Sequence, residues 1–553
     1  MSNSVVVLGG GVAGLTAAHE LAERGFKVTV LELRPHTPGG KARSYGAAKS
    51  GTDGRPDLPA EHGFRFFPGF YKHIPDTMSR IPYGNNRRGV LDNLQESTRA
   101  EIARAGKPAL VLPTRPATNI AELELWLKDA LAPISLGLPP SDLLHFVGLL
   151  VKLLSSCDER RYGEYEYESW WEFSDAANRS KAFQQFLADG LTRSLVAAQA
   201  QRMSARTGGY ILIQLLLSMA SPGTWVDRVL DGPTNDVWID PWKEHICSEF
   251  GVDYRLGAKV TKIELEGSRV SRVQYRQGDR TRTIKADWVV AAFPVEVMSR
   301  LVADNPHLAE RDHRLGELHK LTTRWMNGVM FYLNRRVPVT HGHVIYIDAP
   351  WSLTSISQGQ FWPHTKLQKM GDGTVRDILS VDVSEWTRPG MLYGRPAMKC
   401  NRDEIVAEVW TQLKAHLNSD TTTVLSDSDL VGAFVDDDIV IDSPHGDIDL
   451  EPLLVNTKGS WDLRPTTDTA IENLFLASDY VRTYTDLATM EGANEAARRA
   501  TNCILDATNS DEQRCAVWPL HEPEVFAPLR ELDAVRYRLF SPKASPVGPG
   551  PGR

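Results

Sequence analysis

Three glycines near the start of the chain have the spacing of a nucleotide-binding turn. Gly9, Gly11 and Gly14 follow a short apolar run and open a stretch with a helical pattern, and a second apolar run then ends at Glu32. The first glycine allows a tight turn, the second lets the backbone approach a pyrophosphate, and the third lets helix and strand pack closely. The helix N-terminus offers free N–H groups to phosphates, and the carboxylate of Glu32 is spaced to accept hydrogen bonds from a ribose diol.

The context of these glycines makes a plain structural turn the weaker interpretation, because strand, turn, helix, second strand and acid all agree. The acid also disfavours NADP, since a carboxylate at Glu32 repels a 2′-phosphate.

Length and composition indicate a globular protein of two or three domains. The chain has 553 residues, of which 42% are apolar and 24% charged. The net charge of −8 gives no excess of the basic residues that bind nucleic acid, so we expect no nucleic-acid partner. Five scattered cysteines form no CxxC pair, so neither a zinc site nor a disulfide framework is predicted, and we assign no metal ligand. The sequence carries no signal for an oligomeric state.

Apolar runs bear on the location of the protein. The glycine motif begins too early to leave room for a signal peptide, so we expect a cytoplasmic protein. No run reaches the roughly 18 residues of a transmembrane helix. Two shorter runs, 143–154 and 210–220, are interpreted as buried helices. Alternatively, these runs line an apolar substrate tunnel or form a face that makes peripheral contact with a membrane.

Further strand patterns predict an α/β fold with a discontinuous nucleotide domain. They lie at 251–263, with a hairpin through 264–270, at 286–294 and at 473–480, and a helical pattern follows at 494–500. Residues 120–230 are mostly helical by pattern. We therefore expect a Rossmann-like domain from 1–90, 235–300 and 455–510, an α+β substrate domain from 91–234 and 301–454, and a C-terminal extension, 511–553, that ends in a disordered Pro/Gly tail.

These pieces together resemble the FAD-dependent amine oxidase and phytoene desaturase superfamily, over most of residues 4–505. The resemblance rests on the glycine turn, on the Gly-Gly-Lys-Ala-Arg-Ser stretch at 39–44, and on a closing motif at 475–493. It implies non-covalent FAD, because the closing motif has no cysteine. One departure is Ser478, where the family usually has glycine.

The resemblance also implies where FAD binds. The backbone at Val260 would meet the adenine, Asp479 would bind the ribityl or pyrophosphate region, and the helix after Met490 would aim its N-terminus at the N1–C2=O edge of the flavin. The full set of implied FAD-binding residues is Gly9, Gly11, Gly14, Glu32, Gly40, Arg43, Val260, Asp479, Met490 and Ala493.

Within the superfamily the chain is most similar to carotenoid desaturases and hydroxysqualene dehydroxylases. Residues 61–71 are similar to a segment beside the flavin in that branch, and 325–333 resemble one of its substrate-domain strands. Many amine oxidases place a lysine on that strand, bonded through water to flavin N5, whereas this chain has Asn327. That difference counts against an ordinary oxygen-using amine oxidase.

By the resemblance, FAD carries out hydride transfer at N5, and the protein positions the substrate and excludes water. Candidate catalytic residues are Glu61, His62 and Asp486, with Arg65 and Tyr71 beside them. Each has a structural alternative: a backbone anchor for Glu61, a packing histidine for His62, and a turn residue or helix cap for Asp486.

Three hypotheses follow for the function. The first is an FAD-dependent oxidoreductase that desaturates or dehydroxylates an apolar, isoprenoid-like small molecule. The second is an FAD amine oxidase or a tailoring dehydrogenase on a polar metabolite, suggested by Asp486 and its polar neighbours Tyr484 and Thr485. The third is a flavin-free lipid carrier, against which the intact glycines and Glu32 argue.

Overall fold

The computed structural model describes residues 3–114, 137–190, 192, 198–220, 225–441, 448–540 and 550–551. Most of the expected Pro/Gly tail, and the helical pattern between 120 and 136, lie outside these residues.

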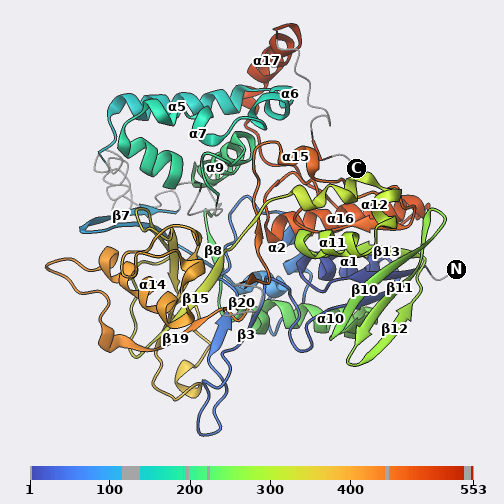
Figure 1. Cartoon of the computed structure of the whole chain (residues 1–553), viewed down its shortest axis with the longest axis horizontal. Helices are drawn as coiled ribbons and strands as arrows, with labels where there is room; N and C mark the ends of the chain where they lie inside the picture. The colour runs from blue at the N-terminus through green and yellow to red at the C-terminus, as the bar shows by residue number, and fades with distance from the viewer. Residues whose placement is uncertain are drawn as a thin grey trace.

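A parallel sheet of five strands forms the core of the nucleotide-binding half, on the right in Figure 1. All four strand pairings in it are parallel. The strand order is β23 (Leu474–Leu476), β13 (Trp288–Ala291), β1 (Ser4–Leu8), β2 (Lys27–Leu31) and β9 (Asp253–Arg255). These strands all lie within the three segments that we assign to the nucleotide domain, although the exact boundaries of that domain stay a prediction.

Both faces of this sheet are covered, which explains why β1 is continuously apolar. Val5 and Val7 pack on one side against helices, and Val6 and Leu8 pack on the other against a second, antiparallel sheet. The first layer contains α1 (Val12–Glu23), α10 (Asp240–Phe250) and α16 (Met490–Ala507). The second contains β10 (Ala258–Glu266), β11 (Arg269–Gln277), β12 (Arg280–Ile284) and α11 (Val295–Asp304).

A mixed sheet of seven strands forms the core of the other half, on the left in Figure 1. One face packs against α14 (Arg402–Leu417), through Ile405, Val409 and Leu413. The strand order is β19 (Leu430–Val435), β15 (Asn327–Leu333), β18 (Asp377–Val383), β17 (Leu353–Ser357), β16 (His343–Tyr346), β6 (Arg99–Arg104) and β7 (Lys107–Pro113).

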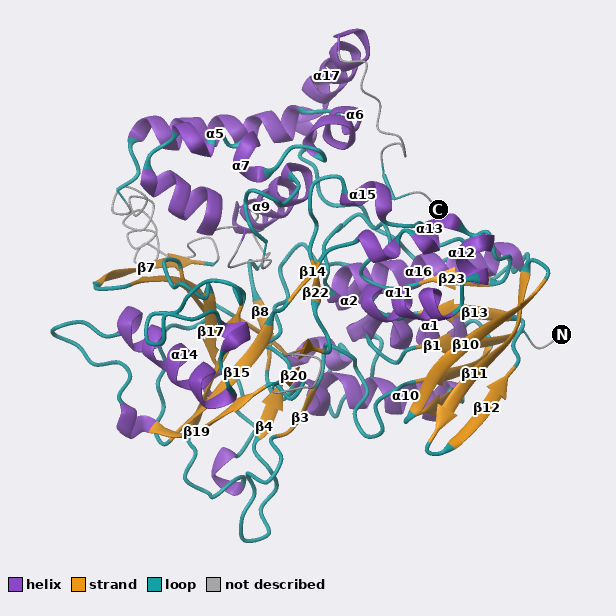
Figure 2. Cartoon of the chain, viewed as in Figure 1, coloured by secondary structure: helices purple, strands orange, loops and turns teal. Residues whose placement is uncertain are grey.

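A helical unit lies above the seven-stranded sheet in Figure 2. Its helices are α5 (Pro140–Ser155), α6 (Asp158–Arg160), α7 (Trp170–Phe173), α9 (Ala205–Ala220) and α17 (Ala527–Phe540). The two apolar runs of the sequence are α5 and α9. The expectation that both are buried is wrong for α5, because Leu144 is 75% exposed and Val147 55%. Helix α17 belongs to the C-terminal extension, where no helix was predicted.

Short antiparallel ladders join the halves, and one of them carries Glu61. They pair β3 (Ser44–Gly46) with β4 (Pro59–Glu61), β5 (Leu94–Glu96) with β8 (Arg228–Leu230), β14 (Thr323–Arg324) with β22 (Leu453–Leu454), and β20 (Ile439–Val440) with β21 (Ile448–Asp449). Within the described residues, no helix combines the length and the apolar character needed to cross a bilayer.

Candidate functional site

The glycine turn between β1 and α1 has the geometry of a phosphate cradle. Gly9 has φ +106°, a conformation that L side chains rarely adopt. A Cβ on Gly14 would lie 1.9 Å from the carbonyl oxygen of Gly9, so only glycine lets α1 pack this close. Helix α1 begins after Gly11 with no side-chain cap, which leaves its first N–H groups free to bind an anion. The turn therefore fits the pyrophosphate of a dinucleotide.

The second glycine stretch lies directly against this turn. Gly39 forms a parallel bridge with Gly11, and a Cβ on Gly40 would lie 3.1 Å from the Cα of Gly11. Gly40 itself has φ +59°. The fold thus places two glycine segments against each other. A cofactor that lies across both segments requires such an absence of side chains.

Glu32 lies at the end of β2, where its carboxylate is held by backbone donors. The N–H groups of Gly10 and Arg34 each donate to it at 2.7 Å, and burial raises the pKa of the carboxyl group. The N–H of Ala258 donates to the carbonyl oxygen of Glu32, which brings the start of β10, and with it Val260, beside the acid. Glu32 and Val260 thus fit the ribose and adenine end of FAD.

Replacing Glu32 by lysine is expected to weaken FAD binding by roughly 10- to 100-fold, the equivalent of one hydrogen bond to a charged group. Lysine removes the acceptor and buries a cation among donors. Fluorescence titration of the apoprotein with FAD measures the change, and Glu266→Gln, at an exposed position on β10, is the matched control. Equal FAD affinity in Glu32→Lys and wild type would remove Glu32 from the ribose role.

The closing motif supplies a second helix N-terminus. Helix α16 begins at Met490, and Oγ1 of its N-cap Thr489 accepts a hydrogen bond from the N–H of Gly492. Ala493 is buried in the first turn. The partial positive charge at this end suits the flavin edge where negative charge collects on reduction.

Glu491 has a different task from its neighbours in the first turn of α16. Its carboxylate accepts hydrogen bonds from the N–H groups of Lys72, His73 and Ile74, the first turn of α2 (His73–Ser79). Burial acts to raise the pKa of Glu491, but the bonds from His73 and Ile74 hold it below its ordinary value. Glu491 therefore caps α2 and fixes it to α16.

Asp479 is partly exposed and lies in the loop that follows β23. The Oγ of Ser478 donates to it at 3.2 Å, and Ser478 has no positive φ, so the departure from glycine causes no strain there. Lys41 pairs with Glu296 at 3.0 Å, and both lie close enough to Asp479 to interact electrostatically.

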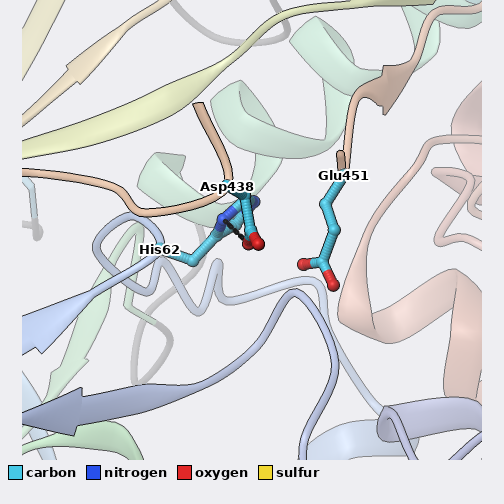
Figure 3. A group of neighbouring side chains, drawn as sticks. All are labelled: His62, Asp438 and Glu451. Atoms are coloured by element: carbon cyan, nitrogen blue, oxygen red, sulfur yellow. Dashed lines mark ion pairs between the residues drawn. The ribbon is translucent and has the colours of Figure 1, made fainter. Parts of the chain in front are cut away.

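Arg43 joins the two halves of the molecule. Its guanidinium is 1% exposed and forms ion pairs with Asp438 and with Glu451, and Arg34 pairs with the same two acids at 2.8 and 2.6 Å. Figure 3 shows His62 beside Asp438, with the side chain of Glu451 to the right of both. The potential ligand atoms of these three lie within 4.8 Å of one another, a spacing a metal ion could use. Two guanidinium groups already engage both carboxylates, however, so this geometry favours an ion-pair network over a metal centre.

Glu61 and His62 lie on the seam between β4 and the seven-stranded sheet. Oε1 of Glu61 accepts hydrogen bonds from the N–H and Oγ1 of Thr234 at 3.0 and 2.7 Å, and burial raises the pKa of this carboxyl group. The Nδ1 of His62 is ion-paired with Asp436. Asn327 donates to Asp436 at 3.1 Å and so belongs to the same cluster. The fold brings Glu61, His62, Arg43 and Asn327 into one region.

Asp486 lies in a different cluster. Its carboxylate is ion-paired with Arg206 and Arg464, and it accepts hydrogen bonds from Thr207 and Asn456. Every one of these partners is buried. This placement favours a structural role for Asp486 over contact with substrate.

Comparison with known proteins identifies the family of this fold and site. Residues 12–505 match the family model described as flavin containing amine oxidoreductase. The chain belongs to this family. The match confirms the resemblance seen in the sequence, the FAD cofactor and the oxidoreductase class, and it leaves no support for a flavin-free carrier.

Individual relatives of this flavin-containing amine oxidoreductase are more distant. A carotenoid phi-ring synthase from Chlorobaculum tepidum is 43% identical over 81 residues, or 15% of this chain and 12% of the relative. A D-amino acid dehydrogenase from Cereibacter sphaeroides is 27% identical over 300 residues, or 52% of this chain and 58% of the relative. A putrescine oxidase structure superposes with a TM-score of 0.60 at 14% identity, covering 92% of this chain and 99% of that one, which shows a shared fold.

Sequence reasoning missed the acids that surround His62. Asp436 and Asp438 lie in an acidic run after a strand, a pattern that normally marks an exposed loop, yet both are buried. The partners Arg34 and Arg43 precede them by about four hundred positions, so only the fold joins them. The one local signal was the run itself, because acids such as Asp436 and Asp438 are costly to bury without cationic partners.

Proposed function

We propose that this flavin-containing amine oxidoreductase desaturates or dehydroxylates an apolar, isoprenoid-like substrate. Asn327 is the observation that carries the proposal, because a neutral carboxamide bonded to Asp436 stands where many amine oxidases have lysine. The carotenoid named in the phi-ring synthase relative agrees with this substrate class.

In this proposal FAD, when bound, accepts hydride at N5. The turn at Gly9–Gly14 and Glu32 would hold the dinucleotide, and the N-terminus of α16 would lie toward its flavin end. Phe67 is fully buried against Trp238, with ring centroids 5.5 Å apart, and Phe64 packs beside the seam, so aromatic side chains there exclude water.

Anaerobic titration followed by flavin absorbance tests the proposal. Detergent-solubilised isoprenoids are expected to bleach the oxidised flavin band, whereas putrescine, cyclohexylamine and D-amino acids leave it unchanged. Bleaching by an amine and none by any isoprenoid would transfer the assignment to an amine oxidase or tailoring dehydrogenase.

That second candidate has one specific observation in its favour. The buried acceptor atoms Asn327 Oδ1 and Asp449 Oδ2 have no hydrogen-bond partner within the described part of the chain. Burial raises the pKa of Asp449 to about 6. A substrate bearing an ammonium group would satisfy both atoms. Asp486, which first suggested a polar substrate, gives no such support because its carboxylate is fully engaged.

The exposed apolar residues support peripheral contact with a membrane, from which an apolar substrate would be taken. On α17, Asp533 binds Arg160 of α6, while Leu532, Val535 and Leu539 lie on a face turned away from Asp533 and are exposed. Exposed Arg536 borders that face, the arrangement of a helix lying at an anionic lipid surface. The apolar, exposed residues are Leu529, Leu532, Val535, Leu539 and Phe540 on α17, and Leu144, Val147 and Val151 on α5. All five cysteines are free, which agrees with a cytoplasmic location.

Replacing Leu532 and Leu539 together by glutamate is expected to lower binding to phosphatidylcholine–phosphatidylglycerol vesicles at least tenfold, because each buried leucine contributes about 1.5–3 kcal/mol. Co-sedimentation measures the bound fraction. Leu450→Glu, at a leucine 52% exposed elsewhere on the molecule, is the matched control. An equal loss in the control, or no binding by wild type, would contradict membrane contact through α17.

A further inference from the structure

Asp436 is the hub of the polar cluster on the seam between the two halves. It directly follows β19 and is completely buried. Its Oδ2 is ion-paired with Nδ1 of His62 and accepts a hydrogen bond from Asn327. Its Oδ1 accepts hydrogen bonds from the hydroxyl of Tyr45 at 2.9 Å and from the N–H of Asp438 at 3.3 Å. Four donors thus hold this carboxylate in one orientation.

The carboxylate stays ionised. Burial acts to raise the pKa of Asp436, but His62 and Arg43 outweigh it and hold the pKa well below its usual range. An anion here favours a proton on the nitrogen of His62 that faces it, Nδ1.

The other ring nitrogen of His62 is left available. Within the described part of the chain, the charged contacts of the His62 ring are made by Nδ1, to Asp436 and Asp438, and no hydrogen bond joins Nε2 to another residue. The imidazole is 7% exposed. The main chain is fixed as well, because the carbonyl oxygen of His62 accepts a hydrogen bond from the N–H of Gly328 at 2.8 Å. The ring is therefore held at Nδ1 by Asp436, while no described residue engages Nε2, as a proton carrier requires.

We propose that Asp436 is a positioning residue that fixes the His62 imidazole with Nε2 free to take a proton from the substrate. This inference rests on the proposed function. In a desaturation, FAD would supply the two-electron acceptor for the hydride that one substrate carbon gives up. The neighbouring carbon gives its proton to Nε2, and the electron pair of that C–H bond becomes the new π bond. The imidazolium that forms lies beside the Asp436 anion, which stabilises it.

Other charged groups also face His62 and set the background against which Asp436 acts. They are Asp382 on β18, Asp438 before β20, and Asp449 and Glu451 at and after the end of β21. Arg43, before β3, forms ion pairs with Asp438 and Glu451. All of them remain in an Asp436 variant, so a change in that variant reports the one carboxylate.

Asp436→Asn in the FAD-loaded enzyme tests the inference through the pH profile of kcat/KM. Turnover with the substrate that bleaches the flavin is expected to fall roughly 10²- to 10⁴-fold. The pH profile should move, because the imidazolium that forms on His62 loses its counter-ion. The FAD content should be unchanged, and Asp437→Asn, which neutralises the exposed acid next to Asp436, should change turnover less than about threefold.

A double variant separates positioning from general structural damage. If Asp436 acts through His62, adding Asp436→Asn to His62→Ala causes little further loss. An equal additional loss in that background, or a pH profile that does not move, would overturn the inference. Proton NMR gives a readout without substrate: wild type should show a downfield His62 Nδ1–H signal that Asp436→Asn lacks. If only the proposed function is wrong, this NMR signal is still present in wild type. If the signal is absent from wild type, the inference about Asp436 is overturned, whatever the function.

Discussion

Gly14→Ala is expected to yield a folded protein that has lost its flavin. The added Cβ would lie 1.9 Å from the carbonyl oxygen of Gly9 and 2.9 Å from its carbon, so helix α1 must move away from the turn. Overpacking of this kind costs about 1–3 kcal/mol, and here the displaced atoms are the phosphate-binding N–H groups. The ratio of flavin to protein absorbance after purification measures the loss, and circular dichroism verifies the fold.

Gly148→Ala is the matched control for this effect. Gly148 also lies within a helix, α5, but a Cβ there meets nothing within 4 Å. Alanine favours helix more than glycine by about 1 kcal/mol, so this variant should keep its flavin and be at least as stable as wild type. Full flavin content in folded Gly14→Ala would show that the close helix–strand contact is dispensable.

Asp486→Asn is expected to lower the free energy of unfolding by about 3–5 kcal/mol, the usual result of removing one partner from a buried ion pair. The change leaves Arg206 and Arg464 buried with one counter-ion fewer, because Glu166 is the other acid that contacts Arg206. Urea denaturation followed by tryptophan fluorescence measures the loss.

The same variant separates the two interpretations of Asp486. A structural role predicts that the protein still folded turns over at a rate per bound flavin close to that of wild type. Asp506→Asn is the matched control, because its ion pair with Arg514 is exposed and contributes less than about 1 kcal/mol. Unchanged stability together with lost turnover would return Asp486 to the catalytic residues.

The nucleotide-binding half was predictable because its signals are local. Gly9, Gly11 and Gly14 fix one turn, and β1 is continuously apolar because both faces of a parallel sheet are covered. The proline at 294 lies between β13, which ends at Ala291, and α11, so it marked a boundary between elements in the same way. Such features depend on residues a few positions apart, which a single sequence displays.

The seam around His62 could not be predicted, because it is assembled from distant parts of the chain. Arg34 and Arg43 neutralise Asp438 and Glu451, and no local pattern indicates which cation will face which acid. The exposure of α5 was missed for a related reason: an apolar run predicts a helix, but only the fold determines how much of its surface is covered.

A crystal structure of the FAD-loaded protein tests the central claim most directly. We expect the pyrophosphate at the N-terminus of α1, the ribose on the carboxylate of Glu32, and the flavin ring between the N-terminus of α16 and the seam at His62. A dinucleotide bound elsewhere, or a trough filled by side chains with no room for the flavin, would contradict the account.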